Sequence, residues 1–379
     1  MDTILRKINI FSTFTIVVFG LIGHFFTILV YSRKKFRTNS AHVHLLCLAI
    51  IDSIFLLIHL FEDTLRTFND VYFNSNNNST AMINIKNIIQ TINLTDKNDT
   101  ACKTINYLRY TLRLISAYTI VGFTIQRYFI IKSPLESRLN TKKASWSTFI
   151  VISIVSLVLN LWVPFLFKIQ ENKNYCDINK NYRNSYFTIG IIFIITCIMI
   201  PIIIIFGFNI LIIRATKAAD IKRTKLQASM SKRNISTTLK TSLNLNKTNS
   251  SKLTNFDINS AKQSRASVNS QIMVYYSNLD NFSNKIKCKT TNTKKITQML
   301  LFLSFSYAFL NLPYFIIWLC FFTRVAFQKY DDMQIFEIFN VLHYAIYFYV
   351  NWASSGMFRS QLKNLCKIRI LEILVKYRF

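Results

Sequence analysis

The feature that most constrains the fold of this chain is a set of long apolar runs without a charged residue. Four such runs occupy residues 8–31, 144–167, 184–213 and 296–323. Each exceeds the ~20 residues that a helix needs to cross a bilayer. Only a helix satisfies its own backbone in lipid, and an apolar helix of this length cannot expose its surface to water. The runs therefore predict membrane-spanning helices.

Three further apolar runs carry charge. They are residues 43–60 with Asp52, residues 104–131 with Arg109, Arg113 and Arg127, and residues 333–358 with Glu337. Charge inside a membrane is costly and therefore usually marks function. The sequence thus predicts an all-α membrane protein, a bundle of seven transmembrane helices whose third and seventh helices carry functional side chains.

Basic residues indicate the orientation of these spans. The formal charge is +29, and Lys and Arg cluster after the first, third, fifth and seventh runs. Such loops stay in the cytoplasm, so we expect the N-terminus and residues 62–101, 168–183 and 324–332 outside, and the C-terminus inside. We therefore expect the basic residues to interact with lipid at the membrane surface and not with nucleic acid. The first run is too long for a signal peptide and lacks a cleavage site.

Three segments outside the spans have a distinct composition. Residues 62–101 form a long extracellular loop, in which "INIKNIIQTI" (83–92) predicts a short amphipathic helix. Residues 215–293 are rich in Lys, Ser, Thr and Asn, which predicts a disordered cytoplasmic loop with candidate kinase sites. In residues 358–379, Phe358, Leu362, Leu365 and Ile368 fall at helical spacing with Arg and Lys between them, which predicts an amphipathic C-terminal helix on the inner leaflet.

Several residues in these segments are candidates for modification. The glycosylation acceptor pattern occurs in the outer loop at Asn77, Asn78, Asn93 and Asn98. Cys102 and Cys176 both face the oxidising side, which permits a disulfide between them. Cys366 follows the last span among basic residues, a setting in which palmitoylation occurs.

Several motifs stand together in one order and spacing. They are "LAIID" ending at Asp52, Cys102 placed 25 residues before Arg127, Pro201, Pro313 within "FLNLPYF", and Phe358 followed by Arg359. In this arrangement the chain resembles the rhodopsin-like family of G-protein-coupled receptors. The resemblance covers the spans and the terminal helix but not the two long loops. It implies one receptor domain over residues 1–379, in the plasma membrane, that signals to heterotrimeric G proteins.

Arg127 and Tyr128 resemble the end of the family's third-helix Asp-Arg-Tyr motif. The resemblance implies that Arg127 lies at the cytoplasmic end of the third helix and helps to accept a G protein. A snorkelling arginine at the interface is the alternative. Gln126 replaces the acid of the motif, and no acid precedes the sixth span at residues 293–295. The loss of both carboxylates predicts a weakened inactive state with raised basal signalling.

Other family positions in the core are altered. Asp52 and Ser116 resemble two members of the family's sodium pocket, but His24 replaces its asparagine partner on the first helix. A direct contact between Asp52 and His24 is an equal alternative to sodium. Asn311 stands where the sixth helix usually has tryptophan. Tyr347 replaces the asparagine of the seventh-helix Asn-Pro-x-x-Tyr motif, whose proline is missing.

The ligand face of the third helix carries two arginines. Arg109 occupies the position of the aspartate in amine receptors of this family, which disfavours an amine ligand. Arg113 lies one turn further along the same face. Glu62, Asp63 and Glu337 could neutralise the two cations, and internal pairing of at least one arginine is favoured. The other would then hold a ligand carboxylate or phosphate.

Aromatic residues are the candidate walls of the ligand site. They are Tyr110, Tyr314, Phe315 and Trp318. The alternative is that these side chains only pack between helices. The seventh span has no lysine, which excludes a retinal Schiff base.

The strings "FLNLPYFI" and "SSGMFRSQL" resemble invertebrate neuropeptide receptors of the FMRFamide-like sort. The favoured function is therefore a peptide-activated receptor, with G protein, kinases and arrestin as expected partners. The alternatives are a receptor for a small anionic or lipid ligand, and a weakly signalling or decoy receptor. A transporter ranks last, because repeat symmetry is missing. No nucleophile–base pair, metal cluster or phosphate loop indicates an enzyme or a cofactor.

Overall fold

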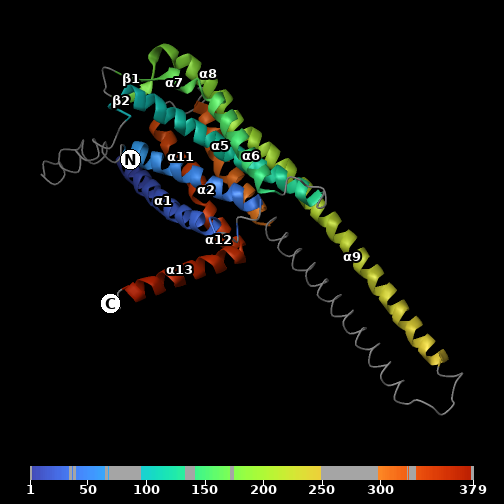
Figure 1. The fold of residues 1–379 in the computed structure, drawn as a ribbon. Coiled ribbons are helices and arrows are strands. Elements are labelled where there is room, and N and C mark those ends of the chain that lie inside the picture. The colour runs from blue at the N-terminus through green and yellow to red at the C-terminus, as the bar shows by residue number, and fades with distance from the viewer. Residues whose placement is uncertain are drawn as a thin grey trace. The chain divides into compact units, whose positions relative to one another are not determined.

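The computed structural model describes residues 2–33, 36, 40–64, 67, 95–132, 141–170, 175–248, 298–321, 323 and 330–376. The chain divides into two compact units, Met1–Leu211 with Gln298–Phe379, and Ile212–Thr297. The first unit is a bundle of helices (Figure 1). In the second unit, the described residues are 212–248, and all of them belong to one helix.

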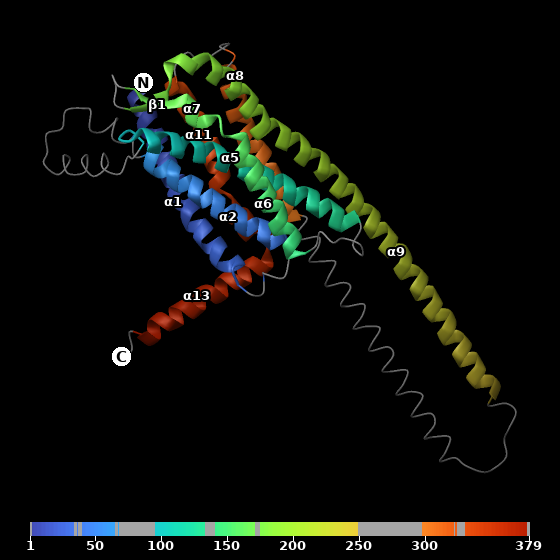
Figure 2. The same ribbon diagram turned by 45° about the horizontal axis from the view of Figure 1, so that its top comes forward.

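The first half of the bundle is built from long helices. They are α1 (Asp2–Tyr31), α2 (Ser40–His59) with a π-helical turn η1 (Leu60–Thr64), α5 (Asp99–Lys132) and α6 (Lys142–Leu159). Figures 1 and 2 show these helices side by side, with α2 between α1 and α5. The Thr141 side chain caps α6 by accepting a hydrogen bond from the Ala144 N–H at 3.2 Å.

A short hairpin follows α6. The chain continues through α7 (Val163–Leu166), β1 (Phe167–Gln170), β2 (Tyr175–Ile178) and the 3-10 turn η3 (Lys180–Tyr182). The strands are antiparallel, and Ile169 pairs with Cys176. Asp96 accepts a hydrogen bond from the Cys176 N–H and Asp99 accepts one from the Ile169 N–H, at 2.8 and 3.2 Å. These bonds fasten the hairpin to the beginning of α5. Such short strands have no periodicity that could be predicted. The fourth predicted span, residues 144–167, agrees with the apolar helical segment Lys142–Leu166 that α6 and α7 form together.

The fifth crossing is formed by α8 (Arg183–Ile194), a π-helical turn η4 (Ile195–Met199) and α9 (Ile200–Thr248). The prediction of disorder over residues 215–293 is wrong for its first part, because α9 continues to Thr248. No glycine or proline follows Gly207 in this helix, so nothing in the backbone chemistry ends it. The rest of the predicted cytoplasmic loop lies outside the described residues.

The remaining helices are Gln298–Phe321, α11 (Tyr330–Ala345), α12 (Tyr347–Ser354) and α13 (Gly356–Lys376). Among the described residues, six helices are long and apolar enough to cross a membrane by length and composition alone. The seventh predicted span is divided at Ile346 into α11, with 16 residues, and α12, with 8. The terminal helix begins two residues before its predicted start and follows a break at Ser355.

The predicted outer loop is shorter than expected. The turn η1 continues α2 as far as Thr64, and α5 already begins at Asp99. Both ends of the expected loop, residues 62–101, are therefore helical. The amphipathic helix predicted over residues 83–92 lies outside the described part of the chain.

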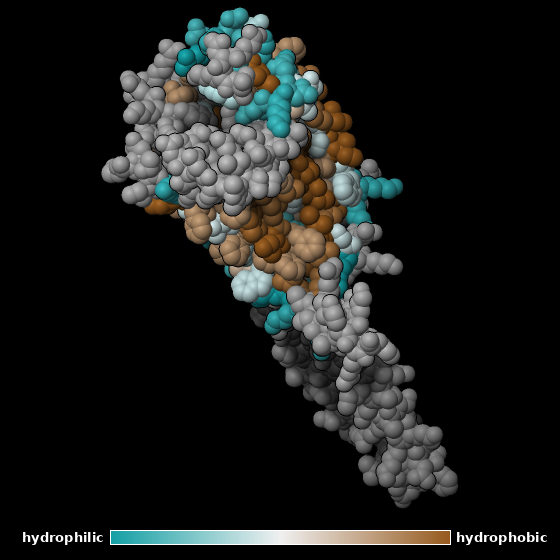
Figure 3. All heavy atoms as spheres, turned by 90° about the vertical axis from the view of Figure 1, so that its left-hand side faces the viewer, coloured by the Kyte–Doolittle hydropathy of each residue, from teal (hydrophilic) through white to brown (hydrophobic). Residues whose placement is uncertain are grey.

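The core of the bundle lies where α1, α2, α5 and α11 meet. Its fully buried members include Val17, Phe55, Leu112, Val341 and Tyr344. On the outside, α6 exposes apolar side chains, and Val151, Ile154 and Val158 are 56%, 55% and 59% exposed. Figure 3 shows hydrophobic side chains gathered over the middle of another face of the bundle. Such a surface suits lipid rather than water.

A close approach of α1 to α11 yields a first prediction. A Cβ atom at Gly20 would lie 2.7 Å from the Ala345 Cβ and 3.0 Å from its Cα. Gly20→Ala is expected to destabilise the protein by about 1–3 kcal/mol, because the helices must move apart. Thermal unfolding of the detergent-purified protein measures this. Gly207→Ala, whose Cβ would meet nothing within 4 Å, is the control, and equal losses in both variants would contradict the expectation.

Candidate functional site

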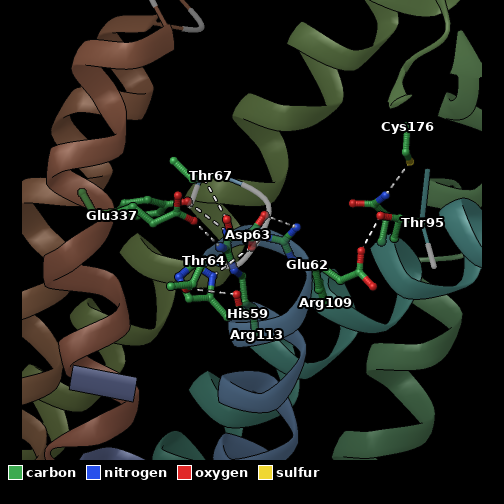
Figure 4. Close-up of polar contacts among 12 residues, drawn as sticks. His59, Glu62, Asp63, Thr64, Thr67, Thr95, Arg109, Arg113, Cys176 and Glu337 are labelled. Carbon is green, nitrogen blue, oxygen red and sulfur yellow. Dashed lines mark hydrogen bonds and ion pairs between the residues drawn. The ribbon is translucent and has the colours of Figure 1, made fainter. Parts of the chain in front are cut away.

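An ion pair joins α5 to the turn η1, which follows α2. Arg109 binds Asp63 with both guanidinium nitrogens, Nη1 to Oδ1 at 3.2 Å and Nη2 to Oδ2 at 2.5 Å (Figure 4). His59 Nδ1 lies 2.9 Å from the same Oδ2. The π-helical turn η1 carries Asp63 to this position beyond the end of α2. The bidentate pair neutralises Arg109 within the protein.

Glu62 has a different partner from the one predicted. Its Oε2 accepts a short hydrogen bond from the Thr95 hydroxyl (Figure 4). Thr95 stands four residues before α5, so this bond ties the end of the outer segment to α2. Both side chains are buried.

A second ion pair joins α5 to α11. Arg113 Nη2 donates to Glu337 Oε1 at 3.2 Å, and Arg113 Nη1 donates to the Tyr314 hydroxyl at 2.9 Å. The guanidinium also lies 5.4 Å from the ring centroid of Phe55, within the range of a cation–π contact. The prediction that at least one arginine is paired internally is confirmed, and it holds for both.

The predicted disulfide is confirmed. Cys102 and Cys176 are bonded, with 5.7 Å between their Cα atoms. The bridge joins the first turns of α5 to β2, and Asn106 Nδ2 lies 3.3 Å from Cys176 Sγ. The hairpin is thus held covalently beside the outer end of α5.

A cavity lies inside the bundle between α5, the η4 turn, the helix Gln298–Phe321 and α11. It contains about 570 Å³ of space not filled by atoms, open solvent included. Of the predicted ligand-binding residues, Arg113 and the aromatic residues Tyr110, Tyr314 and Trp318 line it.

Three predicted ligand residues do not line the cavity. Phe315 follows Tyr314 directly, so it points about 100° further around the helix, where it is buried by packing. Arg109 is held by Asp63, and Glu337 neutralises Arg113 without lining the cavity itself. The sequence identified the charged residues correctly, but it could not show which of their side chains line the cavity.

The cavity has polar lining residues that the sequence analysis missed or assigned to another role. Asn311 Nδ2 donates to the Tyr307 carbonyl, and Asn340 Nδ2 donates to Asn311 Oδ1, both at 2.9 Å. The Tyr307 hydroxyl donates to the Cys197 carbonyl at 2.8 Å. Asn340 lies three residues after Glu337 on α11, and helical spacing from that acid is a signal that could have found it.

The altered core positions are joined to neighbouring helices. Asp52 Oδ1 accepts a hydrogen bond from the Ser116 hydroxyl at 2.7 Å, and His24 Nε2 donates to the Tyr344 carbonyl at 2.7 Å. Tyr347 forms a short hydrogen bond with His343. The alternative of a direct bond between Asp52 and His24 is wrong, because Asp52 Oδ2 and His24 Nδ1 have no hydrogen-bond partner within the described ranges.

At the other end of α5, Arg127 is buried. It is 6% exposed, its guanidinium lies 5.4 Å from the Phe123 ring centroid, and its Nη2 has no hydrogen-bond partner among the residues described. The neighbouring Tyr128 packs edge-on against Phe208 of α9, with 5.5 Å between ring centroids.

Gln126 turns towards α2 and α6. Its Oε1 accepts a hydrogen bond from His44 Nε2 at 2.8 Å, and its Nε2 donates to the Ser145 hydroxyl at 3.1 Å. All three side chains are buried. Where the resemblance expected an acid beside Arg127, a neutral amide joins three helices. Sequence reasoning named Gln126 but not His44 or Ser145, because only the packing of α2 and α6 against α5 brings them together.

The candidate modification sites stay predictions. Asn98 is exposed, and its Oδ1 accepts a hydrogen bond from the Thr100 N–H at 2.9 Å. Asn77, Asn78 and Asn93 lie outside the described residues, as does the side chain of Cys366.

Comparison with known proteins agrees with this geometry. The family described as 7 transmembrane receptor (rhodopsin family) matches residues 24–352. The chain therefore belongs to the rhodopsin family of G-protein-coupled receptors. It is a receptor and not an enzyme, a multi-pass protein of the plasma membrane that responds to an extracellular ligand and acts on heterotrimeric G proteins. No curated protein matches the chain.

The second ion pair yields a prediction. The side chains of Arg113 and Glu337 are only 14% and 22% exposed, so Glu337→Gln leaves a buried cation without its counter-ion. We expect a loss of about 3 kcal/mol in the free energy of unfolding, measured by thermal unfolding of the purified receptor. The double variant Arg113→Gln/Glu337→Gln is expected to recover part of it.

The matched control for this prediction is the surface pair of Lys103 and Asp99, whose side chains are 38% and 41% exposed. Asp99→Asn is expected to cost less than about 1 kcal/mol, because water screens the pair. A Glu337→Gln variant as stable as Asp99→Asn would show that the pair of Arg113 and Glu337 does not hold α11 to α5.

Proposed function

We propose that the chain is a peptide-activated receptor of the FMRFamide-like sort, with its N-terminus outside the cell and its C-terminus inside. The observation that carries the proposal is the aromatic cavity beside two arginines that are already neutralised. Neither Arg109 nor Arg113 needs an anionic ligand to balance its charge. An aromatic-lined cavity whose charges are already paired suits the aromatic side chains of a peptide rather than a small acid.

A receptor for a small anionic or lipid ligand is the second candidate. Arg113 lines the cavity, so a ligand carboxylate could replace Glu337 as its partner. A weakly signalling or decoy receptor is the third, and the buried Arg127 and the altered core positions support it.

On the cytoplasmic side, we assign G-protein coupling to Arg127, Tyr128 and Gln126. Serines within residues 215–293 are the proposed kinase targets, followed by arrestin, and Cys366 is the proposed palmitoylation site. In the outer segment, Asn77, Asn78, Asn93 and Asn98 are the proposed glycosylation sites.

A ligand screen tests the proposal. Cells that display the receptor and report second messengers are challenged with synthetic peptides and, separately, with small carboxylates and phosphates. Peptides are expected to activate it, and because they do not cross the membrane, a response also supports the proposed orientation. Trp318→Ala should lower peptide potency about ten-fold, since a ring that lines the cavity is lost. The control Trp352→Ala, at a side chain 49% exposed, should not.

Other outcomes of this screen favour the other candidates. Activation by small acids and by no peptide would contradict the proposal. Internalisation of a peptide without any second-messenger response would favour the decoy.

Basal signalling tests the assignment of Gln126. Gln126→Asp places a carboxylate next to Arg127, whose Nη2 has no hydrogen-bond partner in the described part of the chain. The new charge is expected to restrain Arg127 and to lower ligand-free signalling several-fold. Gln126→Asn also shortens the side chain that meets His44 and Ser145 but adds no charge, so it is the control. An unchanged basal signal in Gln126→Asp, at equal surface expression, would contradict the assignment.

A further inference from the structure

The π-helical turn η4 leaves two carbonyl groups of the fifth crossing without their usual partners. The Ile200 N–H bonds the Ile195 carbonyl, five residues back, and not the Thr196 carbonyl, four residues back. The next residue is Pro201, which has no N–H to give to the Cys197 carbonyl. The regular α-helical pattern would have satisfied both oxygens. Two neighbouring carbonyls, those of Thr196 and Cys197, therefore lack the N–H that an α-helix supplies.

Two tyrosine hydroxyls from other helices take the place of the missing N–H groups. Tyr118 of α5 donates to the Thr196 carbonyl at 3.2 Å. Tyr307 of the helix Gln298–Phe321 donates to the Cys197 carbonyl at 2.8 Å. A main-chain carbonyl can only accept, so in both bonds the hydroxyl is the donor. The turn η4 is thus tied by its main chain to two different helices.

The two tyrosines differ in where they lie. Tyr307 is 2% exposed and lines the cavity, as does Cys197, whereas Tyr118 does not line it. The Tyr307 ring also packs edge-on against His343 of α11, with 4.9 Å between ring centroids. The ring position is therefore fixed by packing, and the hydroxyl adds a bond between the helix Gln298–Phe321 and the fifth crossing.

This bond stands in a chain that lacks the charged restraint of the family pattern. Gln126 is neutral, and its amide bonds to α2 and α6 and not to Arg127. Residues 293–295, which precede the sixth span, include no acid. A hydrogen bond to a buried carbonyl holds two helices together without any charge, and breaking it leaves an unsatisfied acceptor.

We propose that Tyr307 is a positioning residue for signalling, whose hydroxyl holds the helix Gln298–Phe321 to the fifth crossing and so limits signalling without ligand. The bond to Cys197 lies on the cavity wall, where a bound ligand would meet it. The inference holds for any ligand of this receptor and does not depend on a peptide.

Ligand-free signalling tests the proposal in cells that display the full receptor and report second messengers. Tyr307→Phe keeps the ring and removes the hydroxyl. At equal surface expression it is expected to raise the ligand-free signal about two- to ten-fold, the value of one buried hydrogen bond. Tyr118→Phe is the matched control, because it removes the hydroxyl from the neighbouring carbonyl but leaves the helix Gln298–Phe321 in place. Its signal should change less than about two-fold.

A double-mutant cycle tests whether the Cys197 carbonyl is the acceptor that matters. Pro201→Ala supplies an N–H that can bond this carbonyl within its own helix. Tyr307→Phe then no longer leaves a buried acceptor unsatisfied, so its effect should be smaller in the Pro201→Ala background than in the natural one. A purely steric role of the Tyr307 side chain would give the same rise in both backgrounds.

The reactivity of Cys197 gives a readout that needs no signalling. Its thiol is free and 6% exposed, and separation of the two helices would uncover it. Purified receptor is treated with N-ethylmaleimide, and mass spectrometry follows the rate at each cysteine. Tyr307→Phe should speed up the labelling of Cys197 several-fold, and Tyr118→Phe should not. Cys47, which is free and 2% exposed on α2, is the internal control for general loosening.

Each outcome decides for or against the proposal. A ligand-free signal that is unchanged or lower in Tyr307→Phe overturns it, and so does an equal rise in Tyr118→Phe. An equal rise with and without Pro201→Ala overturns the role of the carbonyl. Labelling of Cys197 that stays slow, or that rises together with Cys47, overturns the hold between the helices.

Tyr307→Leu replaces Tyr307→Phe if the latter does not reach the cell surface. Loss of both variants from the surface overturns the proposal, because the residue would then serve folding and not signalling. None of these results bears on the peptide proposal, which the ligand screen decides.

Discussion

Neutralisation of two guanidinium groups inside the bundle is the constraint on which the half of this receptor around the cavity depends. Arg109 and Arg113 lie one turn apart on α5, and the carboxylates that balance them come from η1 and from α11. A charge that is buried in a low-dielectric interior without its partner is strongly destabilising. The pairing therefore sets the positions of α2 and α11 against α5, and with them the shape of the cavity.

Amides replace charges or aromatic rings at two positions of this receptor where the family pattern has an acid or a tryptophan. Gln126 joins α2, α5 and α6 next to Arg127, and Asn311 joins the helix Gln298–Phe321 to α11 beside the cavity. An amide both donates and accepts, so it can link helices without a counter-ion. A carboxylate or an indole ring would offer only one of these functions. The altered residues are thus integrated into the packing.

Much of the architecture could be predicted because it follows from solvation. Uncharged apolar runs long enough to cross a bilayer predicted the spans, and two cysteines on the oxidising side of the membrane predicted the bridge between Cys102 and Cys176. The ends of elements were predicted less well. The continuation of α9 to Thr248, the division of the last span at Ile346 and the β1–β2 hairpin depend on local backbone bonds that composition does not report.

For the candidate site, the sequence determined the inventory: two arginines one turn apart, three acids that could pair with them, and a set of aromatic residues near the outer ends of the helices. Spacing along one helix is an intrachain property, so it can be read directly. Tertiary structure alone decided that Asp63 forms the ion pair with Arg109 and that Phe315 does not line the cavity. It also decided the hydrogen bonds of Glu62 with Thr95 and of Asn340 with Asn311. Each of these depends on how one helix is rotated against its neighbour, which is set by the packing of the whole core.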